Sequence, residues 1–148
     1  MTSHEYTTDL TWTGRTTGYD SYDRRHDVSI GSTNLTLSAD AAFRGDSSLP
    51  NPEQLVVAAA SSCQMLSFLA VAALGGVEVR EYRDEAVGVM DDTVRPMRLT
   101  SISLRPRIVV AASTPDRVDR LLAKAHEQCY IANSLTTPIT LEPVIEVV

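Results

Sequence analysis

A long stretch without charged residues is the feature that most limits how this chain can fold. Residues 54–77 contain no Asp, Glu, Lys or Arg over 24 positions. The stretch still carries several polar residues, and acidic Glu53 and Glu78 flank it where a membrane span usually has Lys or Arg. A helix that is apolar all round can belong to a protein core or to a membrane. We predict a helix buried on all sides within a soluble protein, with no membrane partner.

Local signals define both ends of this helix. Asn51 is a favourable N-cap, Pro52 suits the first helical position, and Gln54 stands where the partner residue of a capping box belongs. At the other end, Gly75 or Gly76 is expected to terminate the helix, because glycine readily adopts the left-handed conformation found there. The sequence therefore predicts one continuous helix between these two signals.

Other segments alternate between apolar and polar residues, as strands do. Gly31 separates two such runs, which indicates a hairpin, and residues 91–93 indicate a turn between two longer runs. Thr114 and Pro115 are expected to cap and open a second helix with one apolar face. This order of elements predicts an α+β fold. The expected strands are residues 5–13, 26–38, 77–90, 97–112 and 139–148, and the apolar face comprises Val118, Leu121, Leu122, Ala125 and Cys129.

Size and charge narrow the range of functions. The chain has 148 residues, enough for one domain, which we expect to span residues 1–148. Lys and Arg number 13 against 19 Asp and Glu, so the net charge of −6 disfavours nucleic acid as a partner. Two cysteines are too few for a secreted disulfide framework, and the first residues lack the pattern of a secretory signal. These features give no indication of secretion.

The two cysteines are the first candidates for chemistry. Cys63 lies in the middle of the charge-free helix, and Cys129 is expected on the inward face of the second helix. They could be two unrelated buried thiols, because free cysteine is among the residues most often buried. They could also meet in one site, where a cation would be needed to activate a mid-helix thiolate. The available cations are Arg15, Arg24 and Arg25 in the N-terminal strand region.

Polar residues near these thiols offer a further alternative. Ser61 and Gln64 need hydrogen-bond partners in an apolar interior, and such groups often mark a site. His126 precedes Cys129 by three positions, on the same side of the expected helix. Together with Cys63, these two residues offer three ligands for a metal ion, so a metal site stays open as an alternative.

Two cysteine motifs resemble those of a known family. Residues 51–55, Asn-Pro-Glu-Gln-Leu, are followed by Ala-Ala-Ala-Ser-Ser-Cys63, which is similar to the first cysteine motif of the OsmC/Ohr family of thiol peroxidases. The segment Ala-His-Glu-Gln-Cys129-Tyr-Ile-Ala-Asn-Ser resembles the family's second cysteine motif. The similarity runs nearly end to end and looks closest to the OsmC-like branch. One difference is Gln64, where many members of this branch have histidine.

The resemblance implies a fold, an assembly and an activity. Curved antiparallel sheets would pack on a long central helix in an intertwined homodimer. The protein would be cytoplasmic. The protein would reduce organic hydroperoxides, and hydrogen peroxide less well, without a cofactor. Cys63 would be the peroxidatic thiol and Cys129 the resolving thiol, with a small or protein-bound dithiol as reductant. A non-catalytic protein on the same fold, binding a small molecule or a metal, stays open as the alternative.

The resemblance also assigns a glutamate and an arginine to the site. Glu53 matches the family's glutamate that holds the catalytic arginine, for which Arg24 in a Tyr-x-Arg-x-His pattern is favoured over Arg15. Ten residues of helix place Glu53 about 15 Å from Cys63 along the helix axis. Either an arginine spans part of this distance, or Glu53 reaches the Cys63 of a second subunit. We expect the second arrangement.

Overall fold

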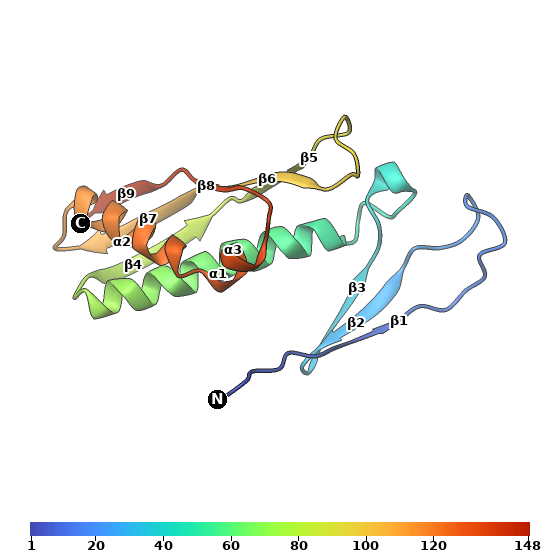
Figure 1. Ribbon diagram of the computed structural model, residues 1–148, viewed down its shortest axis with the longest axis horizontal. Coiled ribbons are helices and arrows are strands. Elements are labelled where there is room, and N and C mark those ends of the chain that lie inside the picture. Colours follow the sequence, from blue (N-terminus) through green and yellow to red (C-terminus); the bar gives the residue numbers. More distant parts are fainter. The chain divides into compact units, whose positions relative to one another are not determined.

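A computed structural model describes residues 1–148, and the chain divides into two compact units, Met1–Leu55 and Val56–Val148 (Figure 1). The first unit holds one sheet of three strands, and the second unit holds two such sheets. One long helix, α1 (Pro52–Leu74), begins at the end of the first unit and continues into the second. The expected single domain over residues 1–148 stays a prediction.

The first unit is a three-stranded antiparallel sheet in the order β1-β2-β3. The turn between β2 and β3 passes through Gly31 at φ +59°, a left-handed conformation that glycine adopts without strain. The hairpin predicted around this glycine is therefore confirmed. The elements of this unit are β1 (Thr8–Thr11), β2 (His26–Ile30), β3 (Thr33–Leu37) and one 3₁₀ turn, η1 (Ala41–Phe43).

Both predicted ends of α1 are confirmed. The backbone N–H of Asn51 donates to the side-chain oxygen of Gln54 at 3.0 Å, and the Gln54 N–H donates to the Asn51 side chain at 2.9 Å. This is the reciprocal pair of a capping box. At the other end Gly76 lies at φ +71°, and the N–H of Val77 donates to the carbonyl of Ala72. These bonds satisfy carbonyls that the end of the helix leaves open.

Only one face of α1 is buried, so the expectation of a helix buried on all sides is wrong for the single chain. The other face leaves Leu66 60% and Leu74 91% exposed. By length and composition alone, α1 could cross a membrane. Its buried face instead packs on other elements of the second unit, as a core helix does. The residues of that face are Ala60, Gln64, Phe68, Val71 and Ala72, which follow helical spacing.

The second unit contains two mixed sheets, β4-β7-β9 and β5-β6-β8. Each of the three long strands expected here is divided in two, and the halves belong to different sheets, so those strand boundaries were wrong. The breaks lie opposite one another: the backbone N–H of Arg105, between β6 and β7, donates to the carboxylate of Asp84 at the end of β4. The strands are β4 (Glu78–Asp84), β5 (Val87–Met90), β6 (Leu99–Leu104), β7 (Pro106–Ala111), β8 (Ile139–Leu141) and β9 (Val144–Val147).

The second helix, α2 (Pro115–Glu127), begins as predicted, because the Thr114 side chain accepts a hydrogen bond from the N–H of Arg117. It ends earlier than the apolar pattern suggested. Cys129 lies beyond α2 in an extended conformation and is the N-cap residue of a short helix, α3 (Tyr130–Ser134). The prediction that Cys129 belongs to the second helix was therefore wrong, although its side chain is buried as expected.

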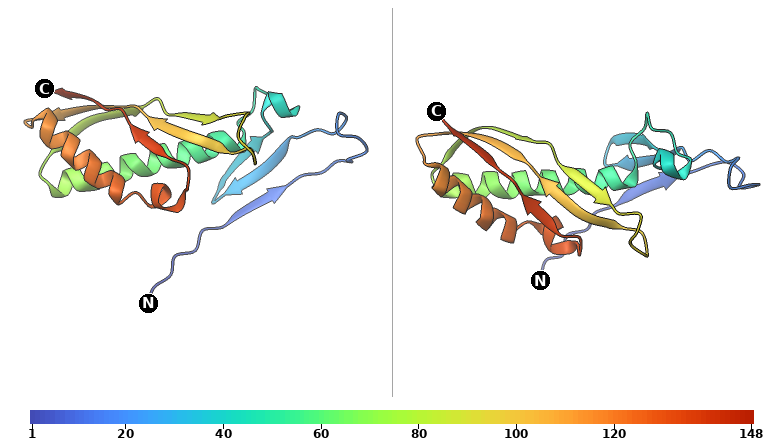
Figure 2. Two further views of the ribbon diagram at one scale, coloured as in Figure 1. Left: turned by 45° about the horizontal axis from the view of Figure 1, so that its top comes forward. Right: turned by 90° about the horizontal axis from the view of Figure 1, so that it is seen from above.

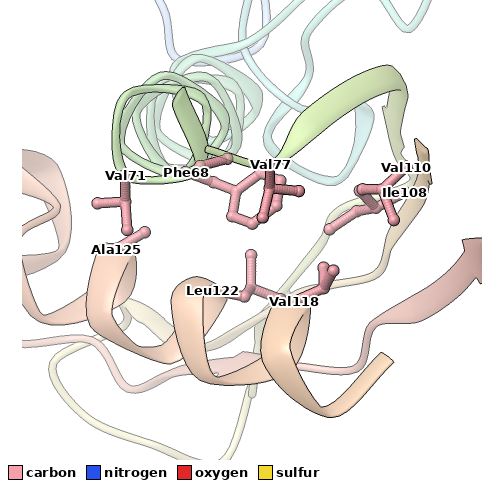
Figure 3. Close-up of a cluster of buried hydrophobic side chains, with 9 residues drawn as sticks. Phe68, Val71, Val77, Ile108, Val110, Val118, Leu122 and Ala125 are labelled. Carbon is pink, nitrogen blue, oxygen red and sulfur yellow. The ribbon is translucent and has the colours of Figure 1, made fainter. Parts of the chain in front are cut away.

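The main hydrophobic core lies between α1, α2 and the sheet β4-β7-β9 (Figures 2 and 3). Phe68 is at its centre, and Leu122 and Ala125 of α2 face α1 from the other side. A second cluster joins Ala60 of α1 to Ile102 and Leu104 of β6. Both clusters belong to the second unit, and together they fix α1 against the sheets and α2.

Candidate functional site

The structure brings the two cysteines together. Cys63 is half-buried on α1, and Cys129 is buried where α2 gives way to α3. Both thiols are free, and Cys63 lies close enough to Cys129 to raise the pKa of its thiol. This arrangement favours one two-thiol site over two unrelated buried cysteines. A disulfide between the two would need Cα atoms about 4.4–6.8 Å apart.

The environment of Cys129, the candidate resolving cysteine, favours its neutral thiol form. Burial raises the pKa of Cys129, backbone N–H groups of α3 counteract part of this rise, and the neighbouring Cys63 adds to it. Desolvation disfavours the charged form of any acid, which explains the direction of the change. Cys129 therefore keeps its proton under neutral conditions. Its side chain is also less exposed to solvent than that of Cys63.

Gln64, next to Cys63 on α1, links this helix to α2. Its side chain is completely buried, with the amide nitrogen donating to the carbonyl of Leu122 at 3.4 Å. The amide oxygen lies 2.9 Å from Nδ1 of His126. His126 thus bonds to Gln64, and no three His, Cys, Asp or Glu side chains in the chain come close enough to hold a metal ion. The geometry gives no support to the metal site of Cys63, His126 and Cys129.

A second polar group lies one turn earlier along α1. The Ser61 hydroxyl donates to the carboxylate of Asp84 at 2.5 Å, and the N–H of Arg105 donates to the other oxygen of the same carboxylate at 2.7 Å. The polar serine that the sequence marked as a possible site residue therefore ties α1 to the break between the strands. Its contacts explain its place in an apolar helix.

Tyr82 is a residue near the thiols that the sequence did not single out. Its hydroxyl is buried and has no hydrogen-bond partner. Burial raises the pKa of this phenol, and the nearby Asp84 and Cys129 raise it further. Its ring packs 5.9 Å from that of Phe68, between ring centroids. Only the alternation of β4 could have indicated that this side chain points inward.

Arg24 and Glu53 line one cavity of about 470 Å³ in the first unit. The Arg24 guanidinium donates to the carbonyls of Tyr22 and Tyr19, both at 2.6 Å, and stacks 3.7 Å from the Tyr22 ring centroid. Its partners in the chain are therefore local carbonyls and aromatic rings, and Glu53 forms no ion pair. The remainder of the lining is largely apolar and includes Leu10, Trp12, Tyr22 and Phe43.

The other two candidate arginines lie elsewhere. Arg15 is exposed and does not line the cavity. Arg25 forms an ion pair with Asp46 at 2.9 Å on the surface of the first unit. Among the three arginines that the sequence offered, Arg24 alone shares the cavity with Glu53.

Comparisons with known proteins give a family and a set of related structures. A family model described as OsmC-like protein matches residues 45–144. The uncharacterized protein YmaD of Bacillus subtilis is 25% identical over 96% of this chain and 93% of its own length. An OsmC-like protein of unknown function from Vibrio cholerae superposes with a TM-score of 0.86 at 28% identity, over 96% of this chain and all of the other. The organic hydroperoxide resistance protein OhrB of Bacillus subtilis shares the fold, with a TM-score of 0.62 at 18% identity over 94% and 98% of the two chains.

Proposed function

This chain belongs to the OsmC-like protein family, and from that premise we propose that it is a thiol-dependent peroxidase that reduces organic hydroperoxides. The observation that carries the proposal is the pair of free thiols, Cys63 and Cys129, which lie close enough for Cys63 to raise the pKa of Cys129. Structural relatives described as organic hydroperoxide resistance proteins support the class of substrate. Hydrogen peroxide would be a poorer substrate, because it offers no apolar group to bury.

The proposed reaction has three steps. The Cys63 thiolate attacks the distal oxygen of ROOH, so that an S–O bond forms, the O–O bond breaks and ROH leaves once it has gained a proton. The Cys129 thiol then attacks the sulfur of the Cys63 sulfenic acid, forming the S–S bond and releasing water. A dithiol finally supplies two electrons and two protons and returns both cysteines to thiols. A reducing compartment such as the cytoplasm suits this last step.

Arg24 and Glu53 complete the proposed site. Arg24 would stabilise the Cys63 thiolate and the developing charge on the peroxide, and Glu53 would orient the guanidinium. Their common cavity supports this pairing, and its apolar lining suits the organic part of a hydroperoxide. Arg15 stays the second candidate for the arginine.

We further propose that the working unit is a homodimer in which Glu53 acts on the Cys63 of the partner subunit. Both residues lie on α1, ten positions and about 15 Å apart along the helix axis, and no side chain closes that distance. The apolar face of α1 that carries Leu66 and Leu74 supports a second chain, because exposed apolar surface of this kind favours association.

Replacing each cysteine tests the activity. Cys63→Ser is expected to abolish reduction of an organic hydroperoxide with a dithiol reductant. Cys129→Ser should allow one turnover at most, followed by oxidation of Cys63 to the sulfinic acid. Peptide mapping of the oxidised wild type should show a disulfide between Cys63 and Cys129 of one chain. Steady-state turnover of Cys63→Ser close to wild type would refute the enzyme assignment.

Two experiments test the assembly. Sedimentation at micromolar concentration should show a dimer, and a stable folded monomer would contradict it. Mixing inactive Glu53→Ala and Cys63→Ser protomers, with subunit exchange verified, should restore part of the activity, because each heterodimer would hold one intact site. No restoration would place Glu53 in the site of its own subunit.

The cavity of the first unit also favours a second candidate, a non-catalytic protein that binds a small apolar molecule. On this hypothesis, ligand affinity would be the same in the wild type and in Cys63→Ser, and no hydroperoxide would be consumed. The dithiol-coupled peroxidase assay therefore separates the two candidates.

A further inference from the structure

A single buried amide connects the helix of Cys63 to the helix that precedes Cys129. Gln64 of α1 is completely buried and, with Ser38, is one of two polar residues in the buried interior. Its amide nitrogen donates to the carbonyl of Leu122, and its oxygen lies 2.9 Å from Nδ1 of His126. The last turns of α2 are therefore bonded to α1, in addition to the apolar contacts between these helices (Figure 3).

The bonding pattern fixes the roles of the atoms. A carbonyl can only accept, so the Gln64 nitrogen must face Leu122, and the amide oxygen must face His126. That oxygen can only accept as well, so Nδ1 of His126 carries the hydrogen.

Gln64 and His126 are each directly linked to one of the two cysteines. Gln64 is adjacent to Cys63 along α1, and the backbone carbonyl of His126 accepts the N–H of Cys129 at 3.2 Å. Cys129 itself lies between the end of α2 and the first turn of α3, where its carbonyl accepts the N–H of Asn133. The Gln64–His126 bond is thus a polar contact that ties the residues just before Cys129 to the helix of Cys63.

We propose that Gln64 and His126 are positioning residues for the resolving thiol. By holding Cys129 next to Cys63, they direct the sulfenic acid to the disulfide before a second peroxide can oxidise it further. This inference rests on the proposed peroxidase activity. The attack of Cys63 on the first peroxide does not require the Gln64–His126 bond, so its loss affects the second step alone.

Variants at His126 test the proposal, because its side chain is only half-buried. His126→Phe removes the N–H donor, whereas His126→Asn offers a side-chain N–H in its place. In His126→Phe the yield of sulfinic acid per turnover should rise about tenfold, as expected for one lost hydrogen bond to a buried group. The rate of Cys63 sulfenic acid formation should stay that of the wild type, and His126→Asn should restore the wild-type yield. Lys124→Ala, exposed on the same helix, is the matched control.

Gln64→Leu removes the other partner, and the double variant Gln64→Leu/His126→Phe should be no worse than the more impaired single variant. Circular dichroism verifies that each variant is folded. The positioning role is wrong if His126→Phe gives the wild-type yield of sulfinic acid. It is also wrong if His126→Phe slows both steps equally, because a general loss of structure would have that effect.

A second measurement needs no peroxide and separates this inference from the proposed function. Equilibration with glutathione redox buffers reports how readily Cys63 and Cys129 form their disulfide. His126→Phe should lower that equilibrium constant about tenfold, and His126→Asn should not. If the wild type consumes no hydroperoxide but this difference appears, the peroxidase proposal fails and the positioning role stands. An unchanged equilibrium constant would overturn the positioning role.

Discussion

The two units of the chain hold their candidate residues in different ways. In the second unit, two hydrophobic clusters fix α1, α2 and the sheets, and the thiol pair lies among these elements. In the first unit, the buried apolar side chains are Val28 and Leu37. Tertiary packing thus determines the geometry of the thiols, whereas Arg24 is held by contacts within its own loop.

The two units also differ in how far apart in the sequence the bonded residues are. The carbonyls that bind Arg24 belong to residues two and five positions away. The bond between Gln64 and His126 joins residues 62 positions apart. An arginine held by local bonds can change its contacts when substrate or a partner chain binds, because no core has to be rearranged. The thiols, by contrast, belong to elements that contribute side chains to the two hydrophobic clusters.

The largest expected effect tests the difference in packing. Phe68→Ala at the centre of the main core should lower the free energy of unfolding by about 3–5 kcal/mol, because it removes a completely buried ring. Leu37→Ala in the first unit should lower the free energy of unfolding by about 2 kcal/mol, the low end for such a truncation, because Leu37 belongs to neither hydrophobic cluster. Denaturant unfolding measures both values. A larger loss for Leu37→Ala would reverse the comparison.

The second prediction tests whether Arg24 of the first unit contributes to activity and little to stability. Arg24→Ala should lower the rate of peroxide reduction by about 10²–10³, the usual effect of removing one group that stabilises transition-state charge. Its free energy of unfolding should change little, because Arg24 contacts carbonyls and aromatic rings of its own loop. Arg15→Ala is the matched control and should keep the wild-type rate. The reverse result would identify Arg15 as the catalytic arginine.

The elements that the sequence predicted correctly depend on local chemistry. The capping box of Asn51 and Gln54, the helix end at Gly76 and the turn at Gly31 each need only a few neighbouring residues. The meeting of Cys63 with Cys129 was foreseen as one alternative, because both were expected to face inward. The family resemblance then favoured that alternative.

The features that the sequence did not reveal depend on tertiary packing. The contact of the Asp84 carboxylate with the backbone N–H of Arg105, at the break between the strands, joins two separate elements, and Pro106 at the start of β7 is the local sign of that break. The partners of Gln64 and the unpaired hydroxyl of Tyr82 also come from other elements. Likewise, the exposed face of α1 could not be distinguished from its buried face, because both are apolar.

A third prediction concerns the reactivity of the two thiols in the second unit. Because burial raises the pKa of Cys129, this thiol stays protonated near neutral pH and should react with iodoacetamide more slowly than Cys63. The folded state favours the neutral thiol, so its contribution to stability is full below the pKa of an unfolded cysteine. That contribution is lost as the pH rises through the higher folded value.

Mass spectrometry of each cysteine peptide between pH 6 and 10 measures this difference, and a urea-unfolded sample gives the reference rates. Denaturation should bring the two rates together. Faster labelling of Cys129 in the folded protein would show that its pKa is not raised.

The smallest expected effect concerns the surface of the first unit, where the pKa of Asp46 is lowered from 3.8 to about 2. The hydroxyl and N–H of Ser48 contribute most to this change, and Arg25 adds to it. A lowered folded pKa means that the carboxylate stabilises the fold above about pH 4 and loses this effect as the pH falls towards 2. Asp46→Asn should therefore be less stable than the wild type at neutral pH, and the difference should shrink between pH 4 and 2.

Asp9→Asn, at an exposed position in the same unit, is the matched control for denaturant unfolding across this pH range. If the difference for Asp46→Asn stayed constant down to pH 2, the bonds to Ser48 and Arg25 would not depend on the charge of Asp46, and the first unit would owe its acid sensitivity to other groups.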